Sequence, residues 1–124
     1  GIYVKKADEA YQVGPGPVKG FLDSRQIVDL AVRIGADAIH PGYGFLSENA
    51  EFAELCQTAG ITFIGPSPHA ITLMGSKVKA RELAKQVGVP IVPGTEGGVA
   101  DVKDGLAFAR QAGYPVIIKA SAGG

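Results

Sequence analysis

One ten-residue segment, His40 to Asn49, constrains the fold of this chain more than any other. It combines two glycines, a proline, a tyrosine, a histidine and a carboxylate, and it directly follows the apolar stretch Ala36 to Ile39, which we expect to form a strand. Gly42 and Gly44 can adopt backbone angles that are closed to other residues, so the chain can turn sharply and a ligand can approach it closely. Open α/β sheets bind ligands in such loops, at the carboxyl ends of their strands. The same residues also fit a plain strand-to-helix turn marked by Pro-Gly.

Helical and strand patterns alternate on both sides of this loop. Apolar residues at helical spacing follow Ser24, the expected N-cap, and Gly35 is the expected stop of that helix. A second helix is predicted over residues 50–58, ended by Gly60, and a second apolar strand follows over 61–64. The alternation predicts the α/β fold class with a parallel sheet.

The second half of the chain continues the pattern. Helices are predicted over 77–87 and 102–112, and the β-prone run 114–120 is predicted to be a strand. We expect a domain boundary near residues 65–68 and an extended linker over 89–94, where two prolines exclude a helix.

Charge and cysteine content narrow the function classes. Lys plus Arg equals Asp plus Glu at 12 each, so no general attraction to nucleic acid or to a membrane surface is expected. No apolar run approaches the ~20 residues of a membrane span. The single cysteine, Cys56, lies in an apolar helical stretch, which favours a buried, inert thiol and a reducing compartment: the cytoplasm, or the mitochondrial matrix of a eukaryote. Because the chain starts at Gly1 and stops within a glycine run, we expect it to be part of a longer polypeptide.

Two lysines are candidates for phosphate binding. Lys119 ends the predicted last strand beside the small-residue loop Ser121 to Gly124, whose amide groups would suit phosphate oxygens, although a strand-end lysine reaching solvent fits equally. The lysine precedes the loop, so this is no Walker A motif. Lys77 follows Gly75-Ser76 at a predicted helix start, where backbone donors and a cation favour an anion; the alternative is an ordinary solvated lysine.

The remaining polar residues predict neither a metal site nor an acid/base pair. His40 fits a histidine hydrogen-bonded to local backbone better than a ligand contact, and His69 is expected on the surface. Neither has a partner at metal-ligand spacing. Glu48 and Glu51 are three residues apart, but nothing marks them as a catalytic pair.

Together these stretches resemble biotin carboxylase, the ATP-dependent component of the biotin-dependent carboxylases. The resemblance runs the length of the chain and rests on six motifs in family order. They are Ala7 to Ala10, His40 to Asn49, Phe63 to Pro66, Leu73 to Lys77, Val89-Pro90 with Val92 to Gly94, and Gly113 to Ala120.

The resemblance implies an ATP-dependent carbon–nitrogen ligase. Enzymes of this family use ATP and Mg²⁺ to activate bicarbonate as carboxyphosphate and then carboxylate biotin held on a carrier. The implied partners are a biotin carboxyl carrier protein or domain, a carboxyltransferase subunit or domain, and further copies in a homo-oligomer. The final carboxyl acceptor is chosen by another domain.

The resemblance also implies an architecture. Residues 1–66 would be the latter part of a Rossmann-like, parallel-sheet N-terminal (pre-ATP-grasp) domain. Residues 67–92 would be a connecting helical segment, and 93–124 the beginning of an ATP-grasp lid.

Six residues match functional positions of the family. The implied ATP-binding residues are Lys77, Lys119, Gly123 and Gly124, and those of the loop at the biotin and bicarbonate end are Tyr43 and Gly44. The catalytic and metal-binding residues would lie outside these 124 residues, so the stretch alone is expected to be inactive.

One departure and two alternatives qualify this picture. Ser76 stands where many family members have aspartate. Another ATP-grasp ligase, such as a carbamoyl-phosphate synthase-like or purine-biosynthetic enzyme, would share the lysine-ended strand and small-residue loop. A non-catalytic scaffold role within a large carboxylase assembly is the other alternative.

Overall fold

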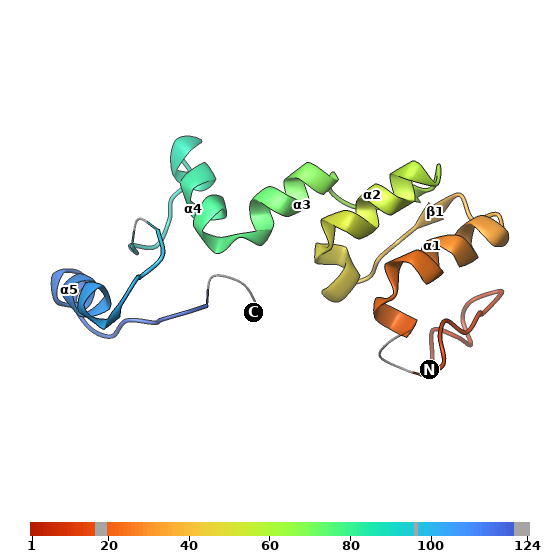
Figure 1. The fold of residues 1–124 in the computed structure, drawn as a ribbon, viewed down its shortest axis with the longest axis horizontal. Helices are drawn as coiled ribbons and strands as arrows, with labels where there is room; N and C mark the ends of the chain where they lie inside the picture. The colour runs from red at the N-terminus through yellow and green to blue at the C-terminus, as the bar shows by residue number, and fades with distance from the viewer. Residues whose placement is uncertain (17–19, 96, 121–124) are drawn as a thin grey trace. The chain divides into compact units, whose positions relative to one another are not determined.

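The computed structural model describes residues 1–16, 20–95 and 97–120. The chain divides into two compact units, a first unit of residues Gly1–Pro68 and a second unit of His69–Gly124 (Figure 1).

The first unit is a small α/β unit built around a parallel strand pair. Its elements in order are η1 (Gly20–Leu22), α1 (Ser24–Arg33), β1 (Ala38–Ile39), η2 (Phe45–Glu48), α2 (Ala50–Thr58) and β2 (Thr62–Phe63). The strands pair in parallel with Ala38 opposite Thr62 and Ile39 opposite Phe63. This confirms the predicted parallel sheet, although both strands are shorter than the predicted ranges 36–39 and 61–64.

Helix α1 is capped one residue earlier than predicted. The N-cap is Asp23, not Ser24: its side chain accepts a hydrogen bond from the Gln26 backbone N–H at 3.0 Å, and Ser24 is already the first helical residue. An aspartate at this position adds a negative charge beside the positive end of the helix dipole, which favours it over the neighbouring serine.

Glycines end three helices in the same way, as predicted. Gly35, Gly60 and Gly88 have φ values of 71°, 73° and 74° and follow α1, α2 and α4 (Lys77–Gln86). After α1 the Ala36 N–H donates to the Ala31 carbonyl at 2.9 Å, and after α2 the Ile61 N–H donates to the Cys56 carbonyl at 2.9 Å. These are the six-to-one hydrogen bonds of Schellman turns, in which the left-handed residue is normally glycine.

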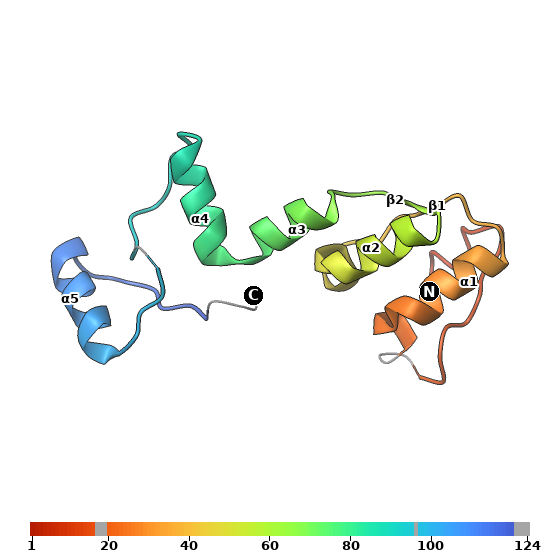
Figure 2. The ribbon, with the colours of Figure 1, turned by 45° about the horizontal axis from the view of Figure 1, so that its top comes forward.

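The core of the first unit lies between the two helices and the strand pair. Helices α1 and α2 pack against each other, and α2 also contacts β2 (Figures 1 and 2). The buried members of this core are Val28, Ala31, Leu46, Phe52, Cys56 and Ile61. Phe52 meets Phe63 edge to face, with ring centroids 5.9 Å apart, an arrangement that aromatic quadrupoles favour.

The second unit is mainly helical. Helix α3 (Pro68–Gly75) begins at the unit boundary and is followed by α4 and by α5 (Val102–Ala112). The bounds of α4 and α5 confirm the predicted helices, whereas α3 was not predicted as a separate helix. Within the described residues, each helix is too short or too polar to traverse a bilayer.

Arg81 fastens the segment after α4 to that helix. Its Nη1 donates to the Val92 carbonyl oxygen at 2.8 Å. The guanidinium also lies close over Gly94, where an added Cβ would come within 2.9 Å of Nη2. The prolines keep this segment out of a helix, as predicted, and the arginine holds it against α4.

The strand predicted over residues 114–120 is wrong. These residues form no helix or strand, and Ile117 and Ile118 are more than 80% exposed. A run of β-branched residues forms a strand only where a neighbouring strand pairs with its backbone hydrogen-bonding groups. None of the described residues pairs with this segment.

The buried thiol generates a test by pH. Burial raises the pKa of Cys56 above its ordinary value of 9.0. We expect the free energy of unfolding to fall as the pH rises above about 9, by at most about 1.4 kcal/mol per pH unit, because the thiol ionises first in the unfolded chain. Below about pH 9 the contribution of the buried thiol to the free energy of unfolding is fully present. Urea unfolding between pH 7 and 10 measures the effect. Cys56→Ala should show a shallower pH dependence, and parallel profiles for the two proteins would contradict the prediction.

Candidate functional site

The loop from His40 to Asn49 leaves the carboxyl end of β1 in a conformation that requires glycine. Gly42 has φ of 77°, and Gly44 has φ of 69° with ψ of −173°, a region open essentially to glycine alone. This confirms the prediction that these glycines turn the chain. Phe45 follows with φ of 50°, which makes it the one non-glycine residue of the described chain with a positive φ.

The second half of the loop is anchored at two points. Leu46 is buried in the core of the first unit, and the Ser47 N–H donates to the Gly44 carbonyl at 3.0 Å. At the far end the Asn49 side chain caps α2 by accepting from the Phe52 N–H at 3.0 Å. The turn is therefore followed by one anchor in the core and by a second at the start of α2.

Before these anchors the loop presents Tyr43 and Gly44. Tyr43 is 100% exposed, and no atom beyond the neighbouring residues in the chain lies within 4 Å of the position that a Cβ on Gly44 would take. A phenol ring and an unobstructed stretch of backbone thus face open space next to one another. Both groups are suited to contact with a ligand rather than to packing.

His40 turns inward to the loop backbone. Its Nδ1 accepts a hydrogen bond from the Gly42 N–H at 3.0 Å, which confirms the prediction of a local backbone partner. An accepting Nδ1 leaves the proton of the neutral ring on Nε2. His40 therefore stabilises the turn.

Lys77 is the first residue of α4. Ser76 caps this helix, and its Oγ accepts from the Lys79 N–H at 3.4 Å, a long hydrogen bond. A helix N-terminus carries a partial positive charge, and lysines at positions 77 and 79 add full charges beside it. The hydroxyl of Ser76 caps the helix without introducing a carboxylate, so this terminus attracts anions more strongly than one capped by aspartate.

Lys119 is exposed and lies in the unpaired segment described above rather than at the end of a strand. Gly123 and Gly124 fall outside the described residues. Tyr43 and Gly44 belong to the first unit, and the other four predicted site residues belong to the second.

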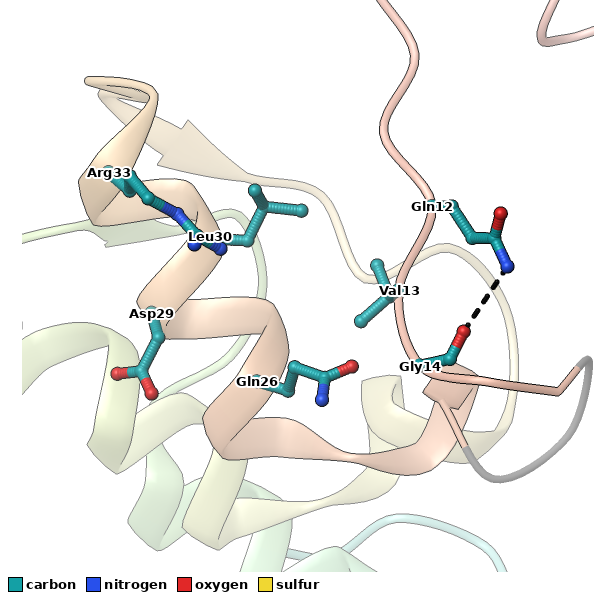
Figure 3. Close-up of a pocket in the computed structure, with 7 residues that line it drawn as sticks. All are labelled: Gln12, Val13, Gly14, Gln26, Asp29, Leu30 and Arg33. Atoms are coloured by element: carbon teal, nitrogen blue, oxygen red, sulfur yellow. Dashed lines mark hydrogen bonds between the residues drawn. The ribbon is translucent and has the colours of Figure 1, made fainter.

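Two shallow pockets have no counterpart in the sequence predictions. The first, of about 590 Å³, lies between the N-terminal segment and α1 (Figure 3); it is lined by Gln12, Val13, Gly14, Gln26, Asp29, Leu30 and Arg33. The second, of about 600 Å³, lies in the second unit against Phe108 of α5 and the segment 93–95. No polar or charged side chain in the described part of the chain is buried, so neither pocket holds a desolvated polar group.

Among the described residues, no group of three or more His, Cys, Asp or Glu side chains could hold a metal ion. His69 is exposed on α3, as predicted for a surface histidine.

Known proteins match both halves of the chain. The family model described as "Biotin carboxylase, N-terminal domain" matches residues 1–71, and the one described as "Carbamoyl-phosphate synthase L chain, ATP binding domain" matches residues 76–124. Biotin carboxylase 1 of Bacillus subtilis is 54% identical over 124 residues, which cover 99% of this chain and 28% of that protein.

Two crystal structures resemble the fold closely. One is the biotin carboxylase domain dimer of Hydrogenobacter thermophilus 2-oxoglutarate carboxylase, in complex with MgADP, ADP and bicarbonate; its TM-score is 0.90 at 54% identity, over 98% of this chain and 27% of that one. The other is the biotin carboxylase of Campylobacter jejuni in a beta-gamma-ATP complex, with a TM-score of 0.90 at 44% identity, over 98% and 28%. This chain thus spans roughly a quarter of the length of each of these three proteins.

The backbone of Gly44 generates a further test. We expect Gly44→Ala to lower the free energy of unfolding by about 1–3 kcal/mol, because a Cβ makes this backbone conformation costly even where space is open. Gly16→Ala is the matched control: it also has open space, its φ is not positive, and the change should be neutral or slightly stabilising. Urea unfolding of the two variants compares the costs. Equal stabilities would show that the glycine backbone at position 44 is not required.

Proposed function

Because the chain belongs to the biotin carboxylase family, we propose that the protein containing it uses ATP and bicarbonate to carboxylate biotin. The observation that carries the proposal is 54% identity to a biotin carboxylase over 99% of this chain. The six-motif resemblance is thereby confirmed. The solved relative with MgADP and bicarbonate supports the same cofactor set.

The proposed chemistry activates bicarbonate by phosphoryl transfer. A bicarbonate oxygen attacks the γ-phosphorus of ATP and ADP leaves, forming carboxyphosphate. The biotin nitrogen then takes the carboxyl group as the bond between the carboxyl carbon and the phosphate oxygen breaks, and the released phosphate takes up the proton that the nitrogen loses. Residues outside this stretch would hold Mg²⁺, which would supply neutralisation of the phosphate charge. Catalysis of this kind depends on positioning and on positive groups around the phosphates.

Lys77 and Lys119 are proposed to supply that positive charge. Support for Lys77 comes from its place at the N-terminus of α4, where its ammonium group adds to the helix dipole. Lys119 is exposed and free of any strand, so its side chain is accessible to a phosphate. Gly123 and Gly124 are proposed to begin the glycine-rich loop that covers the nucleotide.

Tyr43 and Gly44 are proposed to line the biotin and bicarbonate end of the site. The exposed ring and the unobstructed glycine backbone support this role, because both can approach a flat, uncharged ring such as the biotin ureido group. The loop lies at the carboxyl end of a parallel strand, where ligands bind in α/β sheets.

The finer architecture is also a proposal. We assign residues 1–66 to a Rossmann-like N-terminal domain, 67–92 to a connecting helical segment and 93–124 to the start of an ATP-grasp lid. The division of the chain after Pro68 and the match of an ATP-binding family model to residues 76–124 support this assignment.

The partners follow from the proposed reaction. A biotin carboxyl carrier protein or domain would present the biotin, and a carboxyltransferase would take the carboxyl group onward. A homo-oligomer is supported by the dimeric solved relative. The proposed compartment is the cytoplasm, or the mitochondrial matrix in a eukaryote.

The deciding experiment measures ADP release by the full-length protein with bicarbonate, with and without free biotin. We expect release to require bicarbonate and to rise with biotin. ATP hydrolysis at a rate that depends on neither bicarbonate nor biotin would assign the protein to another ATP-grasp ligase, such as a carbamoyl-phosphate synthase-like enzyme. It would also remove Tyr43 and Gly44 from the site. An absence of any ATPase activity would favour the scaffold role.

Lys119→Gln tests the phosphate role in the same protein. We expect bicarbonate-dependent turnover to fall by about 10²-fold, as for the loss of one preorganised charge-stabilising group, while the melting temperature stays near that of the wild type. Lys103→Gln, at an exposed lysine of α5, is the matched control and should leave turnover unchanged. Normal turnover in Lys119→Gln would remove this lysine from the site.

A further inference from the structure

We infer that Phe21 is a positioning residue for the loop His40 to Asn49 and, through it, for biotin. Phe21 lies in η1, well before the loop in sequence, and it belongs to none of the motifs of the resemblance. The inference rests on the proposed function where it concerns biotin, and on geometry alone where it concerns the loop.

The contact is between two aromatic rings. Phe21 and Phe45 meet edge to face, with centroids 5.9 Å apart and ring planes at 88°. Edge-to-face pairs are favourable beyond the area they bury, because the positive ring edge meets the negative ring face. The pair is directional and sets where the Phe45 ring lies.

Phe45 is the loop residue that most needs support. Its φ of 50° is unfavourable for a bulky side chain, and such outliers persist only where the surroundings hold them. It directly follows Gly44, whose extended, positive-φ conformation presents the open backbone of the candidate site. Leu46 fixes the next position by burial in the core. The Phe21 ring thus restrains the one strained side chain between Gly44 and the core.

The residue before Phe21, Gly20, makes a close backbone contact with Val13 and Gly14. Gly20 is buried, and an added Cβ there would come within 2.0 Å of the Val13 carbonyl oxygen; one on Gly14 would come within 2.6 Å of the Gly20 Cα. Only two residues without side chains allow this approach. At its other end, η1 runs into the Asp23 cap of α1. Phe21 therefore projects from a fixed support.

The functional consequence falls at one end of the proposed site. If Phe45 loses its partner ring, the loop can leave the conformation that presents Tyr43 and Gly44, whereas Lys77 and Lys119 belong to the other unit. The loss should weaken the use of biotin and bicarbonate and spare the binding of ATP.

The experiment uses the full-length protein with Phe21→Ala. Its KM for free biotin should rise roughly three- to tenfold, the range expected for the loss of one edge-to-face pair, with the KM for ATP unchanged. Phe21→Tyr keeps the ring and should restore the wild-type KM. Leu22→Ala alters the neighbouring exposed residue of η1, outside the ring pair, and should have no effect.

A second readout does not depend on activity. Hydrogen–deuterium exchange should accelerate in Phe21→Ala across residues 40–49, where the Ser47 N–H donates to the Gly44 carbonyl at 3.0 Å. It should stay unchanged near the end of α2, where the Gly60 N–H donates to the Gln57 carbonyl at 3.1 Å. Unchanged exchange in the loop would overturn the inference, as would an equal rise of the biotin KM in Leu22→Ala.

The two proposals fail separately. Wild-type ADP release that ignores biotin overturns the proposed function, and the exchange measurement still decides whether Phe21 holds the loop. Biotin-stimulated wild-type release with an unchanged KM in Phe21→Ala overturns this inference and leaves the proposed function standing.

Discussion

Two left-handed glycines determine how the first unit is assembled. Gly35 and Gly60 turn the chain after α1 and α2, and each turn ends in a hydrogen bond back to a buried residue of the helix just completed, Ala31 or Cys56. Both strands therefore start from the same kind of turn, tied to a residue in the shared core. The parallel pairing of β1 and β2 follows, and with it the place of the loop His40 to Asn49 at the carboxyl end of β1.

The loop itself combines local strain with external support. Gly44 and Phe45 adopt backbone conformations that the chain would not choose alone, and His40, Leu46 and Phe21 each restrain a different part of the turn. Strain of this kind recurs at functional sites because a preformed loop loses little freedom when a ligand binds. Tyr43 and the Gly44 backbone are thus already ordered before any ligand binds.

Much of the first unit was predictable, because its signals are local. Helix α2 was predicted with its observed bounds, and the turn glycines of the loop were identified from their residue type and their place directly after an apolar strand. The cap of α1 was misplaced by one residue, since Asp23 and Ser24 are both good caps and only dihedral angles decide between them. Pro68 in the first turn of α3 and the apolar residues after it could have revealed that helix.

Other features could not be read from local sequence. The run 114–120 has strong β propensity, yet propensity measures fit to a pleated neighbour, and none of the described residues supplies one. The contact of Phe21 with Phe45 joins residues far apart in sequence, which no local pattern reveals. The contact of Arg81 in α4 with Val92 and Gly94 is also not visible in local sequence, and it ties the segment after the helix back to the helix. Since it closes residues 81–92 into a ring, the segment between them has fewer conformations open to it, and a movement of α4 would carry Val92 with it.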